Sequence, residues 1–150
     1  YKRKEINGNI NENSMFLYSG PSCKKDLHKH SWIRGDYRCD LFRCYVNIDS
    51  HSHRVACLYT GDGDLNKVDI RKIYRRYWDL IGTIQIPHHG SGKFFKAPPP
   101  FDEGGFLCPM SVGNKNSYGH PSPIVISELF LKRNFPILVT EDDTFEEHIY

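Results

Sequence analysis

At 150 residues the chain is long enough for one domain with a substantial buried core. Hydrophobic residues make up 39% of it, a globular composition, and no apolar run reaches the length that spans a membrane. The net charge is only +2, from 20 basic and 18 acidic residues, so charge alone argues neither for nor against a nucleic-acid partner.

The cysteines and the first residues bear on the compartment. Five cysteines, an odd number, do not form the dense framework of a small secreted domain, and no apolar segment of a signal peptide follows the polar amino terminus. We therefore expect reduced thiols, a cytoplasmic protein and no membrane segment. The chain does not begin with methionine, so we expect either a shortened chain or a piece of a longer product.

The first half of the chain predicts two strands and a long helix. Residues 14–19 read as a buried strand, and residues 20–50 as an insertion with neither strand nor helix periodicity. Residues 53–60 are apolar enough for a central strand, which runs into a Gly-Asp turn at 61–64. Apolar residues near a 3.6-residue repeat predict a helix over about 66–81, capped by Asn66.

The second half predicts three further strands and one helix. A strand at 83–87 ends at Pro87, and residues 90–105 read as a surface loop near the site. Residues 106–112 predict an edge strand, because Pro109 cannot donate a backbone hydrogen bond. A loop, a helix over 123–134 capped by Ser122, and a strand at 136–140 complete a layered α/β pattern in a single domain, 1–150.

Two of these strands end in groups that can bind a metal. Asp62 and Asp64 follow the first, and His88 and His89 follow the second. Neighbouring strands would bring a carboxylate and imidazoles together, as a site for one or two metal ions requires. For each histidine alone, a hydrogen-bonded structural role is an equal alternative, and Asp64 reads as a residue of the helix entry.

The insertion contains a second cluster of metal-binding residue types. Sulfur and imidazole at short separations could close a tetrahedral structural zinc site, although the spacings match no familiar zinc finger. Ordinary buried thiols and exposed histidines are the alternative. The residues concerned are Cys23, His28, Cys39 and Cys44.

Three motifs in order resemble a known fold. They are Tyr59-Thr-Gly-Asp62, Ile86-Pro-His-His-Gly-Ser91 and Ser111-Val-Gly-Asn-Lys-Asn-Ser-Tyr-Gly-His-Pro-Ser122. Together they resemble the metallo-β-lactamase fold, in particular the hydrolase domain of bacterial DNA-uptake competence proteins and their stand-alone relatives. The resemblance covers about residues 13–140 apart from the insertion.

The resemblance implies a four-layer αββα hydrolase that holds one or two ions, usually zinc, with manganese as an alternative. Asp62 would bridge the metals and His88 would be the last imidazole ligand, with His89 either a further ligand or a support. The resemblance also implies hydrolysis of a phosphodiester or related ester by a metal-bound hydroxide. The residues expected against the substrate are Ser91, Asn116, Tyr118 and His120. For Tyr118 and His120, holding the loop is an equal alternative.

The chain departs from that family in one large respect. It lacks the His-x-His-x-Asp-His cluster of the first half of the fold, so it resembles only the carboxyl-terminal half. We therefore expect the remainder of the fold from upstream sequence or a partner chain, and self-association through the uncovered sheet. The alternative is a catalytically inactive half-domain that binds nucleic acid or protein, with the basic face of the expected helix at 66–81 as its surface.

Overall fold

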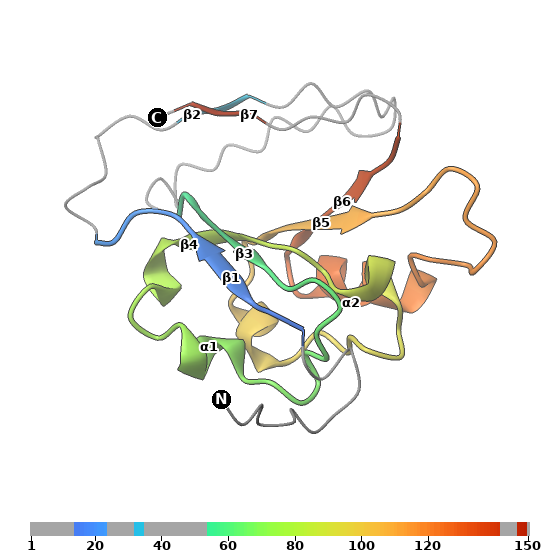
Figure 1. Cartoon of the computed structure of the whole chain (residues 1–150), viewed down its shortest axis with the longest axis horizontal. Coiled ribbons are helices and arrows are strands. Elements are labelled where there is room, and N and C mark those ends of the chain that lie inside the picture. Colours follow the sequence, from blue (N-terminus) through green and yellow to red (C-terminus); the bar gives the residue numbers. More distant parts are fainter. Residues whose placement is uncertain (1–13, 24–31, 35–53, 142–146, 150) are drawn as a thin grey trace, which may run out of the picture.

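The computed structural model describes residues 14–23, 32–34, 54–141 and 147–149. A five-stranded sheet in the order β1-β3-β4-β5-β6 forms its centre, and β2 pairs with β7 in a separate two-stranded sheet (Figure 1). The strands are β1 (Leu17–Ser19), β2 (Trp32–Arg34), β3 (Ala56–Tyr59), β4 (Ile81–Ile84), β5 (Leu107–Ser111), β6 (Phe135–Val139) and β7 (Glu147–Ile149). The helices are α1 (Ile70–Ile73) and α2 (Pro123–Leu131), with 3-10 turns η3 (Trp78–Leu80), η4 (His88–Gly90) and η5 (Pro99–Glu103).

The direction of the strands determines where everything else lies. β3, β4, β5 and β6 are mutually parallel and neighbour one another in chain order, whereas β1 pairs with β3 in the antiparallel direction. When each right-handed crossover adds the next parallel strand on the same side of the previous one, all the connecting segments lie on one face of the sheet. Figure 1 accordingly shows α1 and α2 on one side, with the β2–β7 pair on the other. The predicted mixed α/β class is confirmed.

The core lies between the sheet and this layer of helices and turns. Leu58 of β3, Ile84 of β4 and Met110 of β5 are fully buried, and they meet Val125 and Leu129 from α2. Burial of side chains of this size contributes about 1.5–3 kcal/mol each, so packing against this layer stabilises the sheet.

Gly82 allows β3 and β4 to meet closely. A side chain there would place its Cβ only 1.9 Å from the backbone oxygen of Arg54, at the point where the register between the strands shifts after Ala56. No residue other than glycine fits such an approach.

The strand predicted at 14–19 is shorter and more exposed than expected. β1 covers only Leu17–Ser19, and Leu17 is 50% exposed. It is an edge strand, paired on one side with β3. The prediction of a buried strand was wrong because an apolar run reveals strand propensity and not the position of the strand in the sheet.

The long helix predicted over 66–81 is also wrong. α1 contains four residues and is capped by Asp69, whose carboxylate accepts a hydrogen bond from the Lys72 N–H at 3.0 Å. Beyond it the aromatic residues have separate partners: Tyr77 stacks on Tyr18 at 4.7 Å, and the Trp78 indole donates to Glu103. These tertiary contacts hold the segment in turns, since aromatic residues have only modest helix propensity.

The segment 90–105 was predicted as a surface loop, and this is wrong for two of its aromatic residues, which lie in the core. Phe95 and Phe101 are at most 1% exposed to solvent. Their rings pack edge to face with centroids 5.0 Å apart, and the Phe101 ring also contacts that of Phe106. The buried side chain of Asn134 donates to the Phe101 carbonyl at 2.9 Å. These two aromatic residues therefore belong to the core, although the polar and proline-rich composition of the segment is typical of a loop.

Pro109 does not place β5 at an edge, because β5 lies between β4 and β6. In a parallel strand the N–H and C=O of one residue point to the same neighbour. The Pro109 carbonyl accepts from Ile86 N–H at 2.9 Å, so the missing N–H falls on the β4 side, where the pairing with β5 is short. The uninterrupted β5–β6 ladder is unaffected.

The remaining predicted elements are confirmed within a few residues. They are the strands β3, β4, β5 and β6 and the helix α2, whose first position is Pro123. Ser122 precedes this helix as predicted, but its side chain makes no capping hydrogen bond. The expected insertion at 20–50 is described only at residues 20–23 and 32–34. Among the helices in the described residues, none has both the length and the apolar character that crossing a bilayer requires.

We predict that Phe101→Ala lowers the free energy of unfolding by about 3–5 kcal/mol, because it empties a fully buried site in a segment that resembles a surface loop. Urea denaturation followed by circular dichroism measures this. Ile124→Ala, at a side chain 67% exposed on α2, is the control and should cost roughly 0.5 kcal/mol or less. Equal losses in the two variants would contradict the packing described.

Candidate metal site at the carboxyl edge of the sheet

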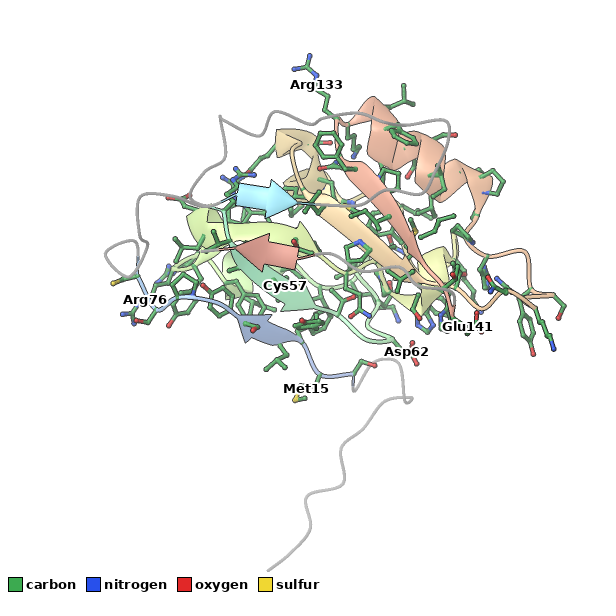
Figure 2. All side chains as sticks on the ribbon, turned by 90° about the horizontal axis from the view of Figure 1, so that it is seen from above. Met15, Cys57, Asp62, Arg76, Arg133 and Glu141 are labelled. Atoms are coloured by element: carbon green, nitrogen blue, oxygen red, sulfur yellow. The ribbon has the colours of Figure 1, made fainter. Side chains whose placement is uncertain are left out.

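The carboxyl ends of the four parallel strands meet at one edge, and each continues into a polar segment. Asp62 follows β3, His88 follows β4, the loop 113–120 follows β5 and Glu141 follows β6. Figure 2 shows Asp62 and Glu141 at this same end of the sheet. In open α/β sheets, this edge is where ligands generally bind.

Gln85 holds the ends of β3 and β4 together beyond the regular ladder. Its side-chain oxygen accepts hydrogen bonds from the N–H groups of Thr60 at 3.1 Å and Gly61 at 3.3 Å. Its carbonyl accepts from the Thr60 hydroxyl at 2.8 Å, and its N–H donates to the Leu58 carbonyl at 3.0 Å. One residue thus fixes the turn that carries Asp62 relative to the strand that carries His88.

Asp62 and His88, predicted as ligands, do lie together. The Asp62 Oδ1 and His88 Nδ1 atoms are 3.8 Å apart, which is too long for a hydrogen bond. Zinc binds such oxygen and nitrogen atoms at about 2.0–2.2 Å, so the spacing is compatible with one ion bound to both atoms. The Asp62 side chain is 55% exposed and that of His88 only 15%, so the pair opens to solvent on the aspartate side.

The His88 ring is held firmly on its other sides. It stacks on Phe94 with ring centroids 3.8 Å apart and planes 22° from parallel. Its Nε2 atom is buried and has no hydrogen-bond partner among the described residues. Because an unsatisfied buried polar atom costs about 1–3 kcal/mol, this ring is not explained by packing alone.

The backbone at the histidine pair is strained. His88, His89 and Gly90 have φ angles of +49°, +56° and +77°, so three consecutive residues are left-handed. This conformation costs about 1–2 kcal/mol for each non-glycine residue, and such strain concentrates at functional sites. At Gly90 a side chain would also place its Cβ 2.7 Å from both Met110 and Pro121, so glycine is required there.

His89 contacts the end of β5. Its Nδ1 lies 2.5 Å from the backbone oxygen of Ser111 at the end of β5, and the side chain is exposed. Since one ring nitrogen is engaged by β5, the contacts of His89 are those of a residue that anchors the turn. Its role as a metal ligand stays a prediction.

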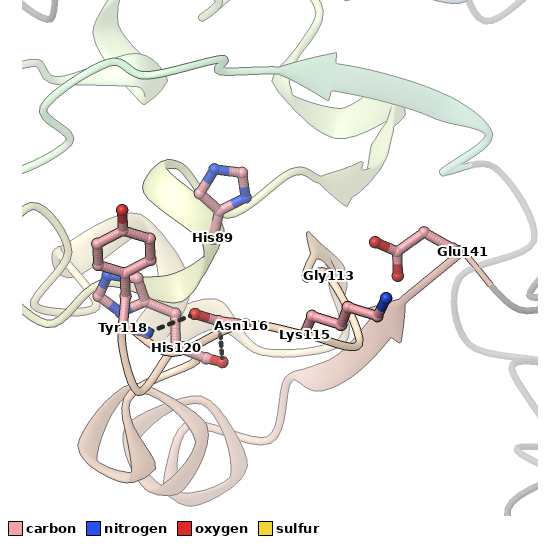
Figure 3. A pocket seen from close by; sticks show the side chains of 7 residues that line it. All are labelled: His89, Gly113, Lys115, Asn116, Tyr118, His120 and Glu141. Atoms are coloured by element: carbon pink, nitrogen blue, oxygen red, sulfur yellow. Dashed lines mark hydrogen bonds between the residues drawn. The ribbon is translucent and has the colours of Figure 1, made fainter.

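Of the residues predicted to contact substrate, three meet around one cavity of about 310 Å³. Asn116, Tyr118 and His120 line it together with His89, Lys115 and Glu141 (Figure 3). Ser91 is apart from these: it is buried, and its hydroxyl accepts from Lys93 N–H at 3.4 Å. These contacts hold the turn after η4.

Asp64 has the structural position expected of it. Its carboxylate accepts from Asn66 N–H at 3.0 Å and lies 3.9 Å from the Lys67 amine. Within the described residues, no three His, Cys, Asp or Glu side chains come close enough to ligate one ion. Of the expected structural zinc cluster, Cys23 is exposed, while His28, Cys39 and Cys44 lie outside the described residues.

Four residues of the site were not singled out from the sequence. Gln85 was visible as a polar residue at a strand end, but its use as an acceptor for the neighbouring turn has no local signal. Lys115 and Phe94 could be found only through the spatial approach of their loops, and Glu141 resembled part of an acidic tail. The Glu141 carboxylate accepts from Asn114 N–H at 2.7 Å and so ties the loop after β5 to the end of β6.

Comparison with protein families, with curated proteins and with solved structures finds no match for this chain. The interpretation of the site therefore depends on its own residues and geometry.

We predict that His89→Gly is more stable than His89→Ala by about 1 kcal/mol, because both variants lose the imidazole but only glycine relieves the left-handed strain. Chemical denaturation of the pair measures the difference. The same two substitutions at exposed Lys96, whose φ is not positive, should give the opposite order. The same order at both positions would contradict a strained turn.

We predict a pH-dependent contact at Glu141. The hydrogen bond from Asn114 N–H lowers the pKa of the Glu141 carboxyl below its ordinary value. Because the folded-state pKa is depressed, its stabilising contribution is present above the unfolded-state pKa and is lost as the pH falls through the folded-state pKa.

Amide NMR tests this: the Asn114 signal should titrate with a midpoint below that of ordinary glutamates, and Glu141→Gln should remove the transition. A midpoint at or above the ordinary glutamate value would refute it.

Proposed function

We propose that the chain is the carboxyl-terminal half of a metallo-β-lactamase-fold hydrolase and supplies Asp62 and His88 to its metal centre. The observation that carries this proposal is the 3.8 Å approach of the Asp62 carboxylate and the His88 imidazole at the ends of adjacent parallel strands. The left-handed backbone that carries His88 supports a functional role for the ring.

The arrangement of layers supports the same proposal. Among the described residues, helices cover only one face of the five-stranded sheet (Figure 1). One sheet with helices on one face is the content of half an αββα sandwich. On the other side of this sheet lies the short β2–β7 pair (Figure 1), where a sandwich would have its second full sheet. The proposal therefore includes a second half, from preceding sequence or a partner chain, which brings further imidazoles to the same edge.

The chemistry of the two side chains suits zinc, with manganese as the alternative, because carboxylate oxygen and neutral imidazole nitrogen are ligands for both. When bound, such an ion lowers the pKa of a coordinated water toward neutrality and stabilises negative charge on a substrate oxygen. Asp62 contributes negative charge on the solvent side. Phe94 keeps the His88 ring in place, and Gln85 preserves the distance between the two turns.

The cationic groups at this edge favour a phosphodiester or related ester as the substrate. Lys115 lines the neighbouring cavity, and the Lys93 amine lies 5.2 Å from the centre of the Phe94 ring that stacks on His88. Both can balance the negative charge that a phosphodiester carries already in its ground state, whereas a lactam carbonyl is neutral until its oxyanion develops.

We predict that Mn²⁺ added to the chain broadens the NMR signals around Asp62 and His88, and that Asp62→Ala or His88→Ala each abolishes this effect. Two ligands hold an ion weakly, so paramagnetic broadening is a suitable measurement for the chain by itself. Competition by Zn²⁺ should restore the signals, because both ions accept the same ligands.

Asp102→Ala is the matched control, since that carboxylate is 60% exposed and pairs with Lys132 elsewhere. Broadening that persists in the Asp62→Ala and His88→Ala variants would place the ion at another site and refute the proposal. The non-catalytic interaction module would then be the better description of this chain.

A further inference from the structure

The outward face of α2 is apolar, although a helix at a protein surface normally carries charged or polar side chains there. Val125 and Leu129 point toward the sheet and are fully buried. On the opposite side, Ile124, Ser127 and Leu131 are three and four residues apart, so they share one face of the helix. Ile124 is 67% exposed and Leu131 is 83% exposed. The helix therefore has large apolar side chains on both its buried and its exposed face.

Two further apolar side chains extend this face toward the edge of the sheet. Phe130 is about half exposed and lies on the side of α2 away from Lys132, which reaches inward to pair with Asp102 of η5. Leu138 of the edge strand β6 is also about half exposed. Its register partner on β5 is the buried Met110, so Leu138 points to the side of the sheet on which α2 lies (Figure 1).

These four exposed side chains, those of Ile124, Phe130, Leu131 and Leu138, form what we call the α2 patch. They expose on the order of 450 Å² between them, within the roughly 300–600 Å² of the largest patch on a typical monomer, which is often functional. Two such patches in contact would bury roughly 900 Å², and their rims would bring the interface toward the small end of stable complexes, about 1,200 Å². The area is therefore sufficient for a weak, reversible dimer.

The lack of charge on the outward face selects the kind of partner. Its exposed residues are Pro123, Ile124, Ser127, Phe130 and Leu131, none of which is charged. A nucleic acid or an acidic peptide would find no cation there to pair with. Helices that bind a bilayer surface usually carry lysine or arginine beside their apolar face, and this face carries neither. A second copy of the chain presents an equally uncharged apolar face.

The spacing of the side chains suits a symmetric contact between two copies of α2. Ser127 lies at the middle of the outward face, and its small side chain allows a second helix to come close. In an antiparallel pair related by a two-fold axis at Ser127, Ile124 of one copy lies opposite Leu131 of the other. The same contact then occurs twice, since a two-fold interface uses one surface on both copies.

We propose that α2 packs against α2 of a second copy of this chain, in an antiparallel two-fold dimer centred on Ser127. This surface and the β2–β7 pair lie on opposite sides of the five-stranded sheet (Figure 1). The α2 patch thus stays accessible when the proposed second half is in place. The inference goes beyond the proposed function and does not depend on a metal at Asp62 and His88.

Sedimentation velocity of the full chain, in buffer with EDTA, tests the dimer. We expect the sedimentation coefficient to rise with concentration between roughly 10 µM and 1 mM, the range of weak association. Leu131→Glu and Ile124→Lys should each weaken association roughly tenfold or more, because each brings an unpaired charge into both symmetric contacts. The matched controls are Ile73→Glu and Ile73→Lys, at an exposed isoleucine of α1, and both should leave association unchanged.

An equimolar mixture of the Leu131→Glu and Ile124→Lys chains tests the antiparallel register. In the mixed dimer the introduced carboxylate lies opposite the introduced amine at one contact, while the original Ile124 and Leu131 meet at the other. The mixture should therefore associate more strongly than either variant alone. Circular dichroism verifies that both variants are folded, as the exposure of the two positions leads us to expect.

A chain that stays monomeric up to about 1 mM, association that persists in Leu131→Glu, or a mixture that associates no better than its components would each overturn the inference. Binding of a monomeric chain to anionic vesicles, lost in Leu131→Glu, would assign the face to a bilayer and would likewise overturn it. Because the experiment is free of metal, its failure is distinct from that of the Mn²⁺ experiment.

Discussion

The parallel pairing of β3 with β4 is the interaction on which the candidate site depends. Parallel strands in chain order bring all their carboxyl ends to one edge, so residues far apart in the chain become neighbours there. Gly82 lets the two strands meet at one end, and Gln85 extends their hydrogen bonding past the other. Without this pairing, the turns that carry Asp62 and His88 would not be held next to each other.

The turn at His88 and His89 shows how the fold maintains a conformation that the chain disfavours. The backbone there is left-handed, yet it is held by contacts from several directions: the Ser111 carbonyl at His89, the Ser122 N–H at the Gly90 carbonyl, and the ring of Phe94 at His88. Strain of this kind persists only where the surroundings determine the geometry. The same contacts join the proposed metal site to the loop that forms the neighbouring cavity.

The elements that sequence patterns predicted well are those with a simple environment. β3 to β6 are short apolar runs bounded by turn residues, and α2 begins at a proline, so local chemistry is sufficient. The helix expected at 66–81 and the loop expected at 90–105 failed for a common reason. In both, aromatic side chains such as Tyr77 and Phe101 pack against distant partners, and that packing overrides local propensity.

The sequence by itself determined the mixed α/β class and the two turns that carry Asp62 and His88, because strand pattern, glycine turns and residue type are local properties. Only the tertiary structure decided that these two residues lie 3.8 Å apart and that His89 turns toward Ser111. It also decided that Lys115, Tyr118 and Glu141 share one cavity. These are distances between segments separated by many residues, and they depend on strand order and on packing of the whole core.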